Sequence, residues 1–232
     1  MEQLEVQGLS IAFQRSGGGP PLVLLHGGLA DSREWRQQLT GLSNDFTVVA
    51  WDAPGCGHSS DPPESFRMSD YADSLAAFIG TVGLDRPHVL GLSWGSTLAL
   101  ELYRRYPALP RTLVLASGYA GWAGSLSPEV VAERLAGFMR QSELPPEQFV
   151  RDWIPSLFTD RAPKELVEET VAMMSELHPA GCRTMIKAMA EADLRDVLPK
   201  IDVPTLLLYG EADTRSPWTW PRSFTLRSEI RH

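Results

Sequence analysis

The sequence predicts an α/β fold built on a mostly parallel, doubly wound sheet, and three observations support this. Short apolar runs recur along the chain, and each is continuous rather than alternating. Such runs are typical of strands buried on both faces. Amphipathic segments of helical length separate them, which favours right-handed crossovers between parallel strands. One serine, flanked by two glycines, directly follows an apolar run and precedes a helical pattern.

Five apolar runs form the strands of the expected sheet: residues 22–25, 46–51, 88–92, 112–116 and 205–209. Between them, residues 71–82 and 97–106 have the apolar stripe of amphipathic helices. The opening segment, residues 4–14, alternates loosely and predicts antiparallel strands at one edge. The glycine-rich run at residues 17–20 lacks the Lys-Ser/Thr of a phosphate loop, so we interpret it as a turn.

Residues 121–190 do not continue the alternation of strands and helices, because they contain no strand-like run and have the pattern of three or four helices. Ser127 followed by Pro128 is a helix start, with serine at the N-cap and proline at the first helical position. The segment is rich in Met, Trp and Phe. We therefore expect a core formed by residues 1–120 and 191–232, with residues 121–190 as a helical cap or lid over a site.

Composition excludes several classes of partner. The 232 residues suit one domain, and the formal net charge of -8 argues against nucleic acid or an anionic membrane surface. No stretch approaches the roughly 20 apolar residues that span a bilayer. No zinc-type spacing or Walker A lysine occurs, so we expect neither a metal nor a cofactor. The expected partner is a small-molecule substrate, and the oligomeric state is left open.

Two cysteines, Cys56 and Cys182, are too few and too far apart for a disulfide framework. The first seven residues carry two glutamates and no basic segment, unlike a secretory signal. We therefore expect a reduced, cytoplasmic protein.

The sequence Gly91-Leu92-Ser93-Trp94-Gly95 matches G-x-S-x-G in the strand–turn–helix setting that this motif requires. In that setting Ser93 occupies a tight, strained turn with its hydroxyl exposed. Gly91 and Gly95 let neighbouring backbone approach without a Cβ clash. We therefore predict that Ser93 is a catalytic nucleophile.

A second turn, His26-Gly27-Gly28, follows the first apolar strand. We predict that the backbone N–H groups of Gly28 and Trp94 form an oxyanion hole. His26 is expected to hold this loop rather than to react. Cys56 has no neighbouring base in the sequence pattern, and we expect it to take no part in the chemistry.

These features resemble the α/β-hydrolase superfamily over nearly the whole chain. The resemblance is carried by the turn at residues 26–28, the loop at 52–59, the elbow at 91–95 and the turn at 210–213. It implies that Asp213 is the acid of a catalytic triad. The sequence around Ser93 is also similar to that of proline iminopeptidases, although the chain lacks their longer His-Gly-Gly-Pro-Gly turn. Ser93 itself argues against the epoxide hydrolases and haloalkane dehalogenases of this fold, which use Asp at the elbow.

Serine needs a base to take its proton, and the superfamily order places a histidine after the triad acid. Only His232 follows Asp213, without room for the usual helix and strand between them. His26, His58, His88 and His178 precede Asp213 and lie in segments unsuited to the role. The final strand is therefore expected to be missing, and His232 is the remaining, weakly supported base.

The tail after Pro217 has no helical stripe and places Trp218 and Trp220 together. Restoring one base after Pro217 permits the residues of an amphipathic helix. We hypothesise that this tail is a frameshift product, which the nucleotide sequence tests.

The predicted function is that of a serine hydrolase that cleaves a carboxylic ester, lactone or related small hydrophobic acyl substrate through a Ser93 acyl-enzyme. The chain itself is expected to be impaired if the base is lacking. Two alternatives stay open. One is a ligand-binding protein without catalysis on the same fold. The other is a peptidase like the proline iminopeptidases.

Overall fold

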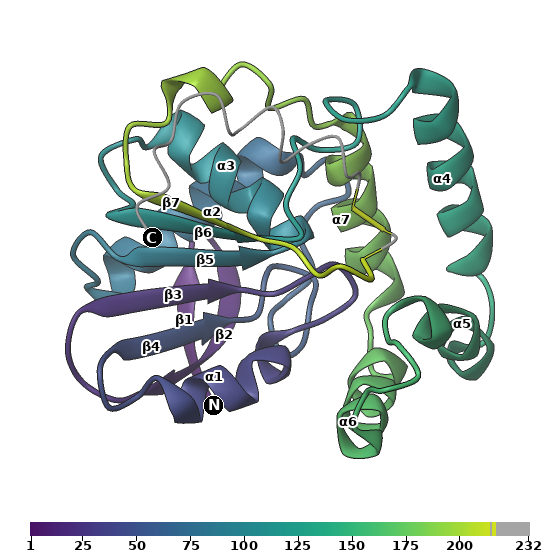
Figure 1. Ribbon diagram of the computed structural model, residues 1–232, viewed down its shortest axis with the longest axis horizontal. Coiled ribbons are helices and arrows are strands. Elements are labelled where there is room, and N and C mark those ends of the chain that lie inside the picture. The colour runs from purple at the N-terminus through teal and green to yellow at the C-terminus, as the bar shows by residue number, and fades with distance from the viewer. Residues whose placement is uncertain (214, 217–232) are drawn as a thin grey trace.

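The computed structural model describes residues 1–213 and 215–216, and these form a central sheet with helices on both faces (Figure 1). The strands are β1 (Glu2–Val6), β2 (Leu9–Ser16), β3 (Pro21–Leu25), β4 (Thr47–Trp51), β5 (His88–Leu92), β6 (Thr112–Ala116) and β7 (Thr205–Leu208). Their order across the sheet is β1-β2-β4-β3-β5-β6-β7. Five neighbouring strands of this order are parallel to one another: β4, β3, β5, β6 and β7. Strand β2 is antiparallel to both of its neighbours, β1 and β4. The predicted mostly parallel α/β sheet is confirmed.

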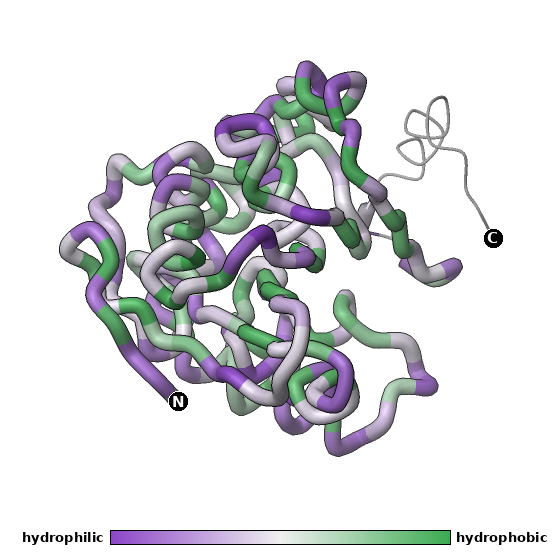
Figure 2. The backbone as a smooth tube through the Cα atoms, turned by 90° about the vertical axis from the view of Figure 1, so that its left-hand side faces the viewer, coloured by the Kyte–Doolittle hydropathy of each residue, from purple (hydrophilic) through white to green (hydrophobic). Residues whose placement is uncertain are grey.

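The helices of the core lie against the two faces of this sheet. They are η1 (Ser32–Trp35), α1 (Arg36–Gly41), α2 (Met68–Val82), α3 (Trp94–Arg105) and η3 (Leu198–Lys200). The apolar strand runs pack between these layers: Val23, Val49 and Val89 are fully buried. The opening hairpin forms the edge predicted for it, and the first residues of the chain are hydrophilic (Figure 2).

Helix α3 begins three residues earlier than its apolar stripe predicts. Trp94 is already helical directly after Ser93, and Trp94 and Leu98 are both buried. The early start places the N-terminus of the helix at the serine itself.

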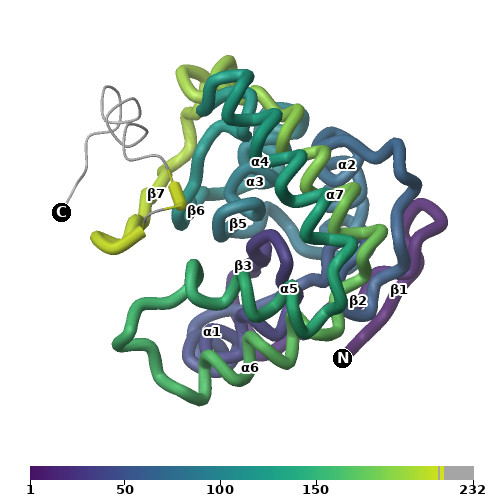
Figure 3. Tube along the Cα trace, turned by 90° about the vertical axis from the view of Figure 1, so that its right-hand side faces the viewer, coloured from purple at the N-terminus to yellow at the C-terminus, as the bar shows by residue number. Residues whose placement is uncertain are grey.

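The four-helix segment comprises α4 (Pro128–Gln141), α5 (Pro146–Trp153), α6 (Lys164–Ser175) and α7 (Pro179–Glu191), with the short η2 (Ile154–Ser156) after α5. The arrows of the parallel strands point toward this segment in Figure 1, and Figure 3 looks directly onto it. As predicted, Ser127 caps α4, because its side chain accepts the Val130 N–H at 3.4 Å.

Neither Cys56 nor Cys182 forms a disulfide, and both are buried. None of the helices in the described ranges is both long and apolar enough to cross a membrane. The missing final strand, the tail after Pro217 and His232 were all predictions about residues outside the described ones, so these stay predictions.

Candidate active site

Ser93 has a left-handed backbone, with φ +52° and ψ -108°. A residue with a Cβ rarely adopts this conformation, and such strain is typical of functional positions. The turn is held from both sides. The Ser93 N–H donates to the Ala116 carbonyl at 2.8 Å, and the Ser93 carbonyl accepts from the Ser96 N–H at 3.0 Å. The chain thus forms a sharp elbow between β5 and α3.

The two flanking glycines are required by backbone contacts. A Cβ on Gly91 would lie 2.2 Å from the Gly95 carbonyl oxygen. A Cβ on Gly95 would lie 2.2 Å from the Leu25 carbonyl oxygen, at the end of β3. Both contacts are with backbone that cannot rotate away. The elbow therefore packs tightly against the end of the neighbouring strand.

Gly28 and Trp94 lie side by side, because a Cβ on Gly28 would be 3.6 Å from the Trp94 Cβ. Within the described residues, neither backbone N–H donates to a protein acceptor. Trp94 is the first residue of α3, where N–H groups have no partner inside the helix. Its indole is buried edge-on against Tyr71, with ring centres 5.2 Å apart, and this packing fixes the residue.

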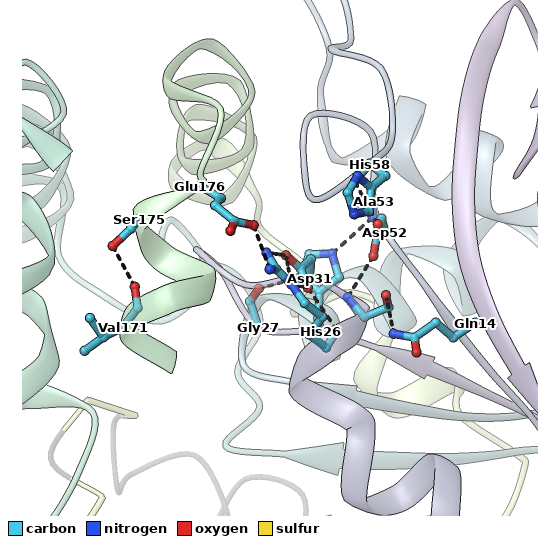
Figure 4. A network of polar contacts seen from close by, with 12 residues as sticks. Gln14, His26, Gly27, Asp31, Asp52, Ala53, His58, Val171, Ser175 and Glu176 are labelled. Atoms are coloured by element: carbon cyan, nitrogen blue, oxygen red, sulfur yellow. Dashed lines mark hydrogen bonds and ion pairs between the residues drawn. The ribbon is translucent and has the colours of Figure 1, made fainter. Parts of the chain in front are cut away.

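A polar network fixes the turn that carries Gly28 (Figure 4). The Ala53 N–H donates to His26 Nε2 at 3.1 Å, and His26 Nδ1 lies 2.8 Å from the Gly27 carbonyl. A neutral ring protonated on Nδ1 satisfies both bonds. Burial lowers the pKa of His26, which favours this neutral form. His26 is therefore structural, as expected from the sequence. Asp52 extends the network by accepting the His58 N–H at 2.9 Å.

Glu34 is a half-buried acid in contact with the same turn. Its Oε2 accepts the Gly27 N–H at 2.7 Å. Burial raises the pKa of Glu34 to about 7, and the negative charge of Asp31 adds to this effect. Nothing in the sequence pattern indicated Glu34, because the contact depends on η1 folding back over the turn.

Asp213 follows the C-terminal end of β7, just as Ser93 follows the C-terminal end of β5. Both residues therefore lie at the same end of the parallel strands. Its Oδ1 accepts the N–H groups of Arg215 and Ser216 at 2.9 and 3.0 Å. Burial raises the pKa of Asp213, but these bonds and one from the Ser117 hydroxyl outweigh it, so the pKa lies below its ordinary value. Oδ2 is buried and has no hydrogen-bond partner among the described residues. Asp213 is thus a carboxylate with one oxygen left to accept a donor.

Two residues near the elbow were missed by sequence reasoning. The Ser96 hydroxyl lies 2.6 Å from the Gly91 carbonyl and 2.9 Å from the Ala116 carbonyl, bridging β5 and β6. Tyr119 is buried, its carbonyl accepts the Thr97 hydroxyl at 3.1 Å, and its own hydroxyl accepts the Trp122 Nε1–H at 3.0 Å. The signal that could have found them is their position directly after the elbow and after the next strand.

Histidines in the described part of the chain make their contacts elsewhere. His88 Nδ1 lies 2.8 Å from Thr112 Oγ1, and His178 Nδ1 lies 2.9 Å from Asp61. None of the four hydrogen-bonds through its ring to Ser93 or Asp213. The predicted base, His232, lies outside the described residues.

A strained serine between two glycines at a strand–helix junction is the defining turn of one fold family, and a family comparison agrees. Residues 20–160 match the family described as alpha/beta hydrolase fold. The chain belongs to the α/β-hydrolase family. The matched range contains the elbow and the turn at Gly28, so the family assignment rests on the same residues as the geometry.

Relatives of this α/β-hydrolase are named as several kinds of hydrolase. A proline iminopeptidase of Heyndrickxia coagulans is 33% identical over 119 residues, 49% of this chain and only 41% of the relative. The 3-oxoadipate enol-lactonase 1 of Acinetobacter baylyi is 25% identical over 89% of this chain and 77% of its own. A solved esterase from Thermogutta terrifontis superposes with a TM-score of 0.87 at 28% identity, over 97% of this chain and 85% of that one. These names support hydrolysis and do not agree on one substrate.

Proposed function

We propose that this chain is a serine hydrolase that cleaves a carboxylic ester, lactone or related small acyl substrate through an acyl-enzyme on Ser93. The observation that carries the proposal is the strained Ser93 turn beside the N–H groups of Gly28 and Trp94, which have no protein acceptor among the described residues. A nucleophile and two donors at one point are what acyl transfer requires.

In the proposed reaction, the Ser93 oxygen bonds to the carbonyl carbon while its proton passes to a base. The carbonyl oxygen becomes an oxyanion, which the Gly28 and Trp94 N–H groups stabilise. The carbon–oxygen bond to the leaving alcohol then breaks, and the alcohol takes the proton from the base. Water hydrolyses the acyl-enzyme by the same steps and restores Ser93.

The base is the part of the proposal for which the described residues offer no candidate. Tyr119 lies near the elbow, where its carbonyl accepts the Thr97 hydroxyl, but burial raises the pKa of Tyr119, so it stays protonated at neutral pH. Asp213 would orient a base through its free Oδ2. We propose His232 for that role, and the four-helix segment, which the sequence predicted as residues 121–190, as a cap over the site.

Hydrolysis of p-nitrophenyl butyrate tests the proposal. We expect turnover by the unmodified chain, and a loss of at least about 10³-fold in kcat/KM in Ser93→Ala. Labelling by a fluorophosphonate should require Ser93 as well. If both proteins hydrolyse the ester at the buffer rate and neither is labelled, while circular dichroism shows them folded, Ser93 is not a nucleophile.

The absence of a described histidine contact to Ser93 favours a second candidate, a ligand-binding protein without turnover. Saturable binding of an ester that is never cleaved would support it. The iminopeptidase relative favours a third, and cleavage of proline p-nitroanilide in preference to butyrate would support that one.

A further inference from the structure

The turn that carries Gly28 has little conformational preference of its own. Gly27 and Gly28 are consecutive glycines, and the covalent chain leaves their backbone dihedral angles nearly free. An oxyanion donor must nevertheless keep one direction, because it acts only when it is aimed at the point where charge develops. The direction of the Gly28 N–H therefore depends on contacts made by the peptide groups around it (Figure 4).

Three contacts fix the two peptide groups that precede and include this N–H. A Cβ on Gly95 would lie 2.7 Å from the His26 carbonyl oxygen, so the elbow closes on one side of the first peptide. On the opposite side, the Gly27 N–H of that peptide donates to Glu34 Oε2 at 2.7 Å. The second peptide is held through its Gly27 carbonyl, which lies 2.8 Å from His26 Nδ1. In a planar trans peptide the N–H points away from the carbonyl, so the Gly28 N–H points away from the His26 ring.

Glu34 contributes to this arrangement from a different segment, the short helix η1. A Cβ on Gly27 would lie 3.6 Å from both carboxyl oxygens of Glu34, so the whole carboxyl faces the turn. The bond to the Gly27 N–H is at the short end of the range for N–H···O bonds, as expected for an acceptor that can carry charge. The turn is thus anchored to η1 by one side chain.

The charged groups near Glu34 have partners of their own. Asp31, whose charge acts on Glu34, pairs with Arg33 at 2.7 Å. Arg33 also pairs with Glu176 of α6 at 2.7 Å. Asp52 accepts a backbone N–H of η1 at 2.8 Å. Within the described chain Glu34 itself has no ion pair, so the Gly27 amide, and not a cation, accounts for the placement of its carboxyl.

We propose that Glu34 is a positioning residue of the oxyanion hole, which holds the Gly27 peptide and thereby keeps the Gly28 N–H aimed at the substrate carbonyl. The effect on catalysis rests on the function proposed above, whereas the hold on the turn does not. Glu34 acts through the reach of its acceptor oxygen and does not react. Because the oxyanion forms only in the transition state, loss of this contact should lower kcat and leave KM nearly unchanged.

Three variants separate reach from charge, with p-nitrophenyl butyrate as the substrate. Glu34→Gln keeps the length and an acceptor oxygen, so its kcat should stay within about threefold of that of the unmodified chain. Glu34→Asp keeps the charge on a side chain that is one methylene shorter, and Glu34→Ala removes the acceptor. These two should lose about 10- to 100-fold in kcat, with KM changed by no more than about twofold. A Gln variant as impaired as the Ala variant, or an Ala variant as active as the unmodified chain, would overturn the inference.

Glu5→Ala is the matched control for the loss of a carboxylate. Glu5 is exposed on β1, at the outer edge of the sheet, and its removal should change kcat by less than about twofold. Circular dichroism and urea titration establish that each variant is folded under the assay conditions. Should Glu34→Ala fail to fold, Glu34→Asp and the amide spectra of the unmodified chain still test the inference.

Amide NMR of the ¹⁵N-labelled chain tests the hold on the turn without turnover. The carboxyl of Glu34 ionises as the pH rises through about 7. The Gly27 amide proton should then move downfield, because a carboxylate is the stronger acceptor. The Gly28 amide should move with the same midpoint, since the held peptide adjoins its own. Both movements should vanish in Glu34→Gln, and the exposed Gly8 should show neither. A Gly27 amide that does not titrate, or that titrates equally in Glu34→Gln, would contradict the hold.

The two experiments together separate this inference from the proposed function. If no chain cleaves the ester while the Gly27 and Gly28 amides follow Glu34, the proposed hydrolase fails and the hold on the turn stands. If the ester is cleaved through Ser93 while Glu34→Ala and Glu34→Asp keep full kcat, the hydrolase stands and Glu34 is not a positioning residue.

Discussion

Glu34 is a half-buried acid whose charge state should affect the stability of the fold. Its pKa is about 7 in the folded chain, chiefly because of burial, against an ordinary value of 4.5. Between these two pH values the folded state binds a proton that the unfolded chain has released. The unfolding free energy contributed by Glu34 is therefore largest at or below about pH 4.5 and falls as the pH rises to about 7. The carboxyl keeps some contact with solvent, so we expect a change of about 2 kcal/mol.

Replacing Glu34 by Gln should remove this dependence, because the amide cannot ionise and its oxygen still accepts the Gly27 N–H. Urea unfolding at pH 5 and pH 8 measures this dependence. The difference in unfolding free energy between the two pH values should be smaller by about 2 kcal/mol in Glu34→Gln. Glu176→Gln is the control, since that carboxyl is exposed and pairs with Arg33 on the surface. An unchanged difference in Glu34→Gln would mean that Glu34 is ionised throughout.

The local sequence predicted some residues of the candidate site and could not predict others. Ser93, Gly91 and Gly95 were recognisable because the elbow is built from five consecutive residues. Glu34 and Ser96 were not, since each acquires its role only when a separate segment packs against the elbow or its turn. Gly28 is an intermediate case: its turn was visible in the sequence, whereas its contact with Trp94 required the fold.

At the scale of elements, the apolar runs predicted the strands well because parallel strands buried on both faces leave little choice of residue. The start of α3 was predicted three residues late, since Trp94 and Gly95 are placed by the elbow rather than by an apolar stripe. The four-helix segment was recognisable by its lack of strands. Its placement against the core depends on contacts between distant segments, such as Gly55 with Gly181, that no local pattern carries.

The stability of the junction between β5 and α3 should depend on the size of the residue at position 91. Gly91→Ala would put a methyl group 2.2 Å from the Gly95 carbonyl oxygen, so the backbone must shift. We expect a loss of at least about 3 kcal/mol in unfolding free energy, measured by urea titration. Gly80→Ala is the matched control, because Gly80 is exposed within α2 and a Cβ there meets nothing within 4 Å. That variant should gain about 0.5–1 kcal/mol. Equal effects of the two substitutions would contradict the tight elbow.

Ion pairs at the scale of the whole molecule join the core to the four-helix segment. Arg33 pairs with Glu176 and Arg36 with Glu169, at 2.7 and 2.6 Å. These pairs are exposed, so each contributes at most about 1 kcal/mol. The apolar contacts of α7, where Met185 and Met189 are buried, are therefore the main attachment of the segment to the core.

Within the described residues, little covers the edge of the sheet formed by β7. β7 pairs only with β6 in the described part of the chain, and Leu206 and Leu208 are 53% and 44% exposed. An apolar strand with a free edge favours pairing with another chain. We expect light scattering to show association that rises with protein concentration, and Leu206→Lys to reduce it while changing the unfolding free energy by no more than about 0.5 kcal/mol. Leu157→Lys replaces a leucine of similar exposure outside any strand, and it should not have this effect. Association that persists in Leu206→Lys, or that Leu157→Lys reduces equally, would show that the edge of β7 is not its cause.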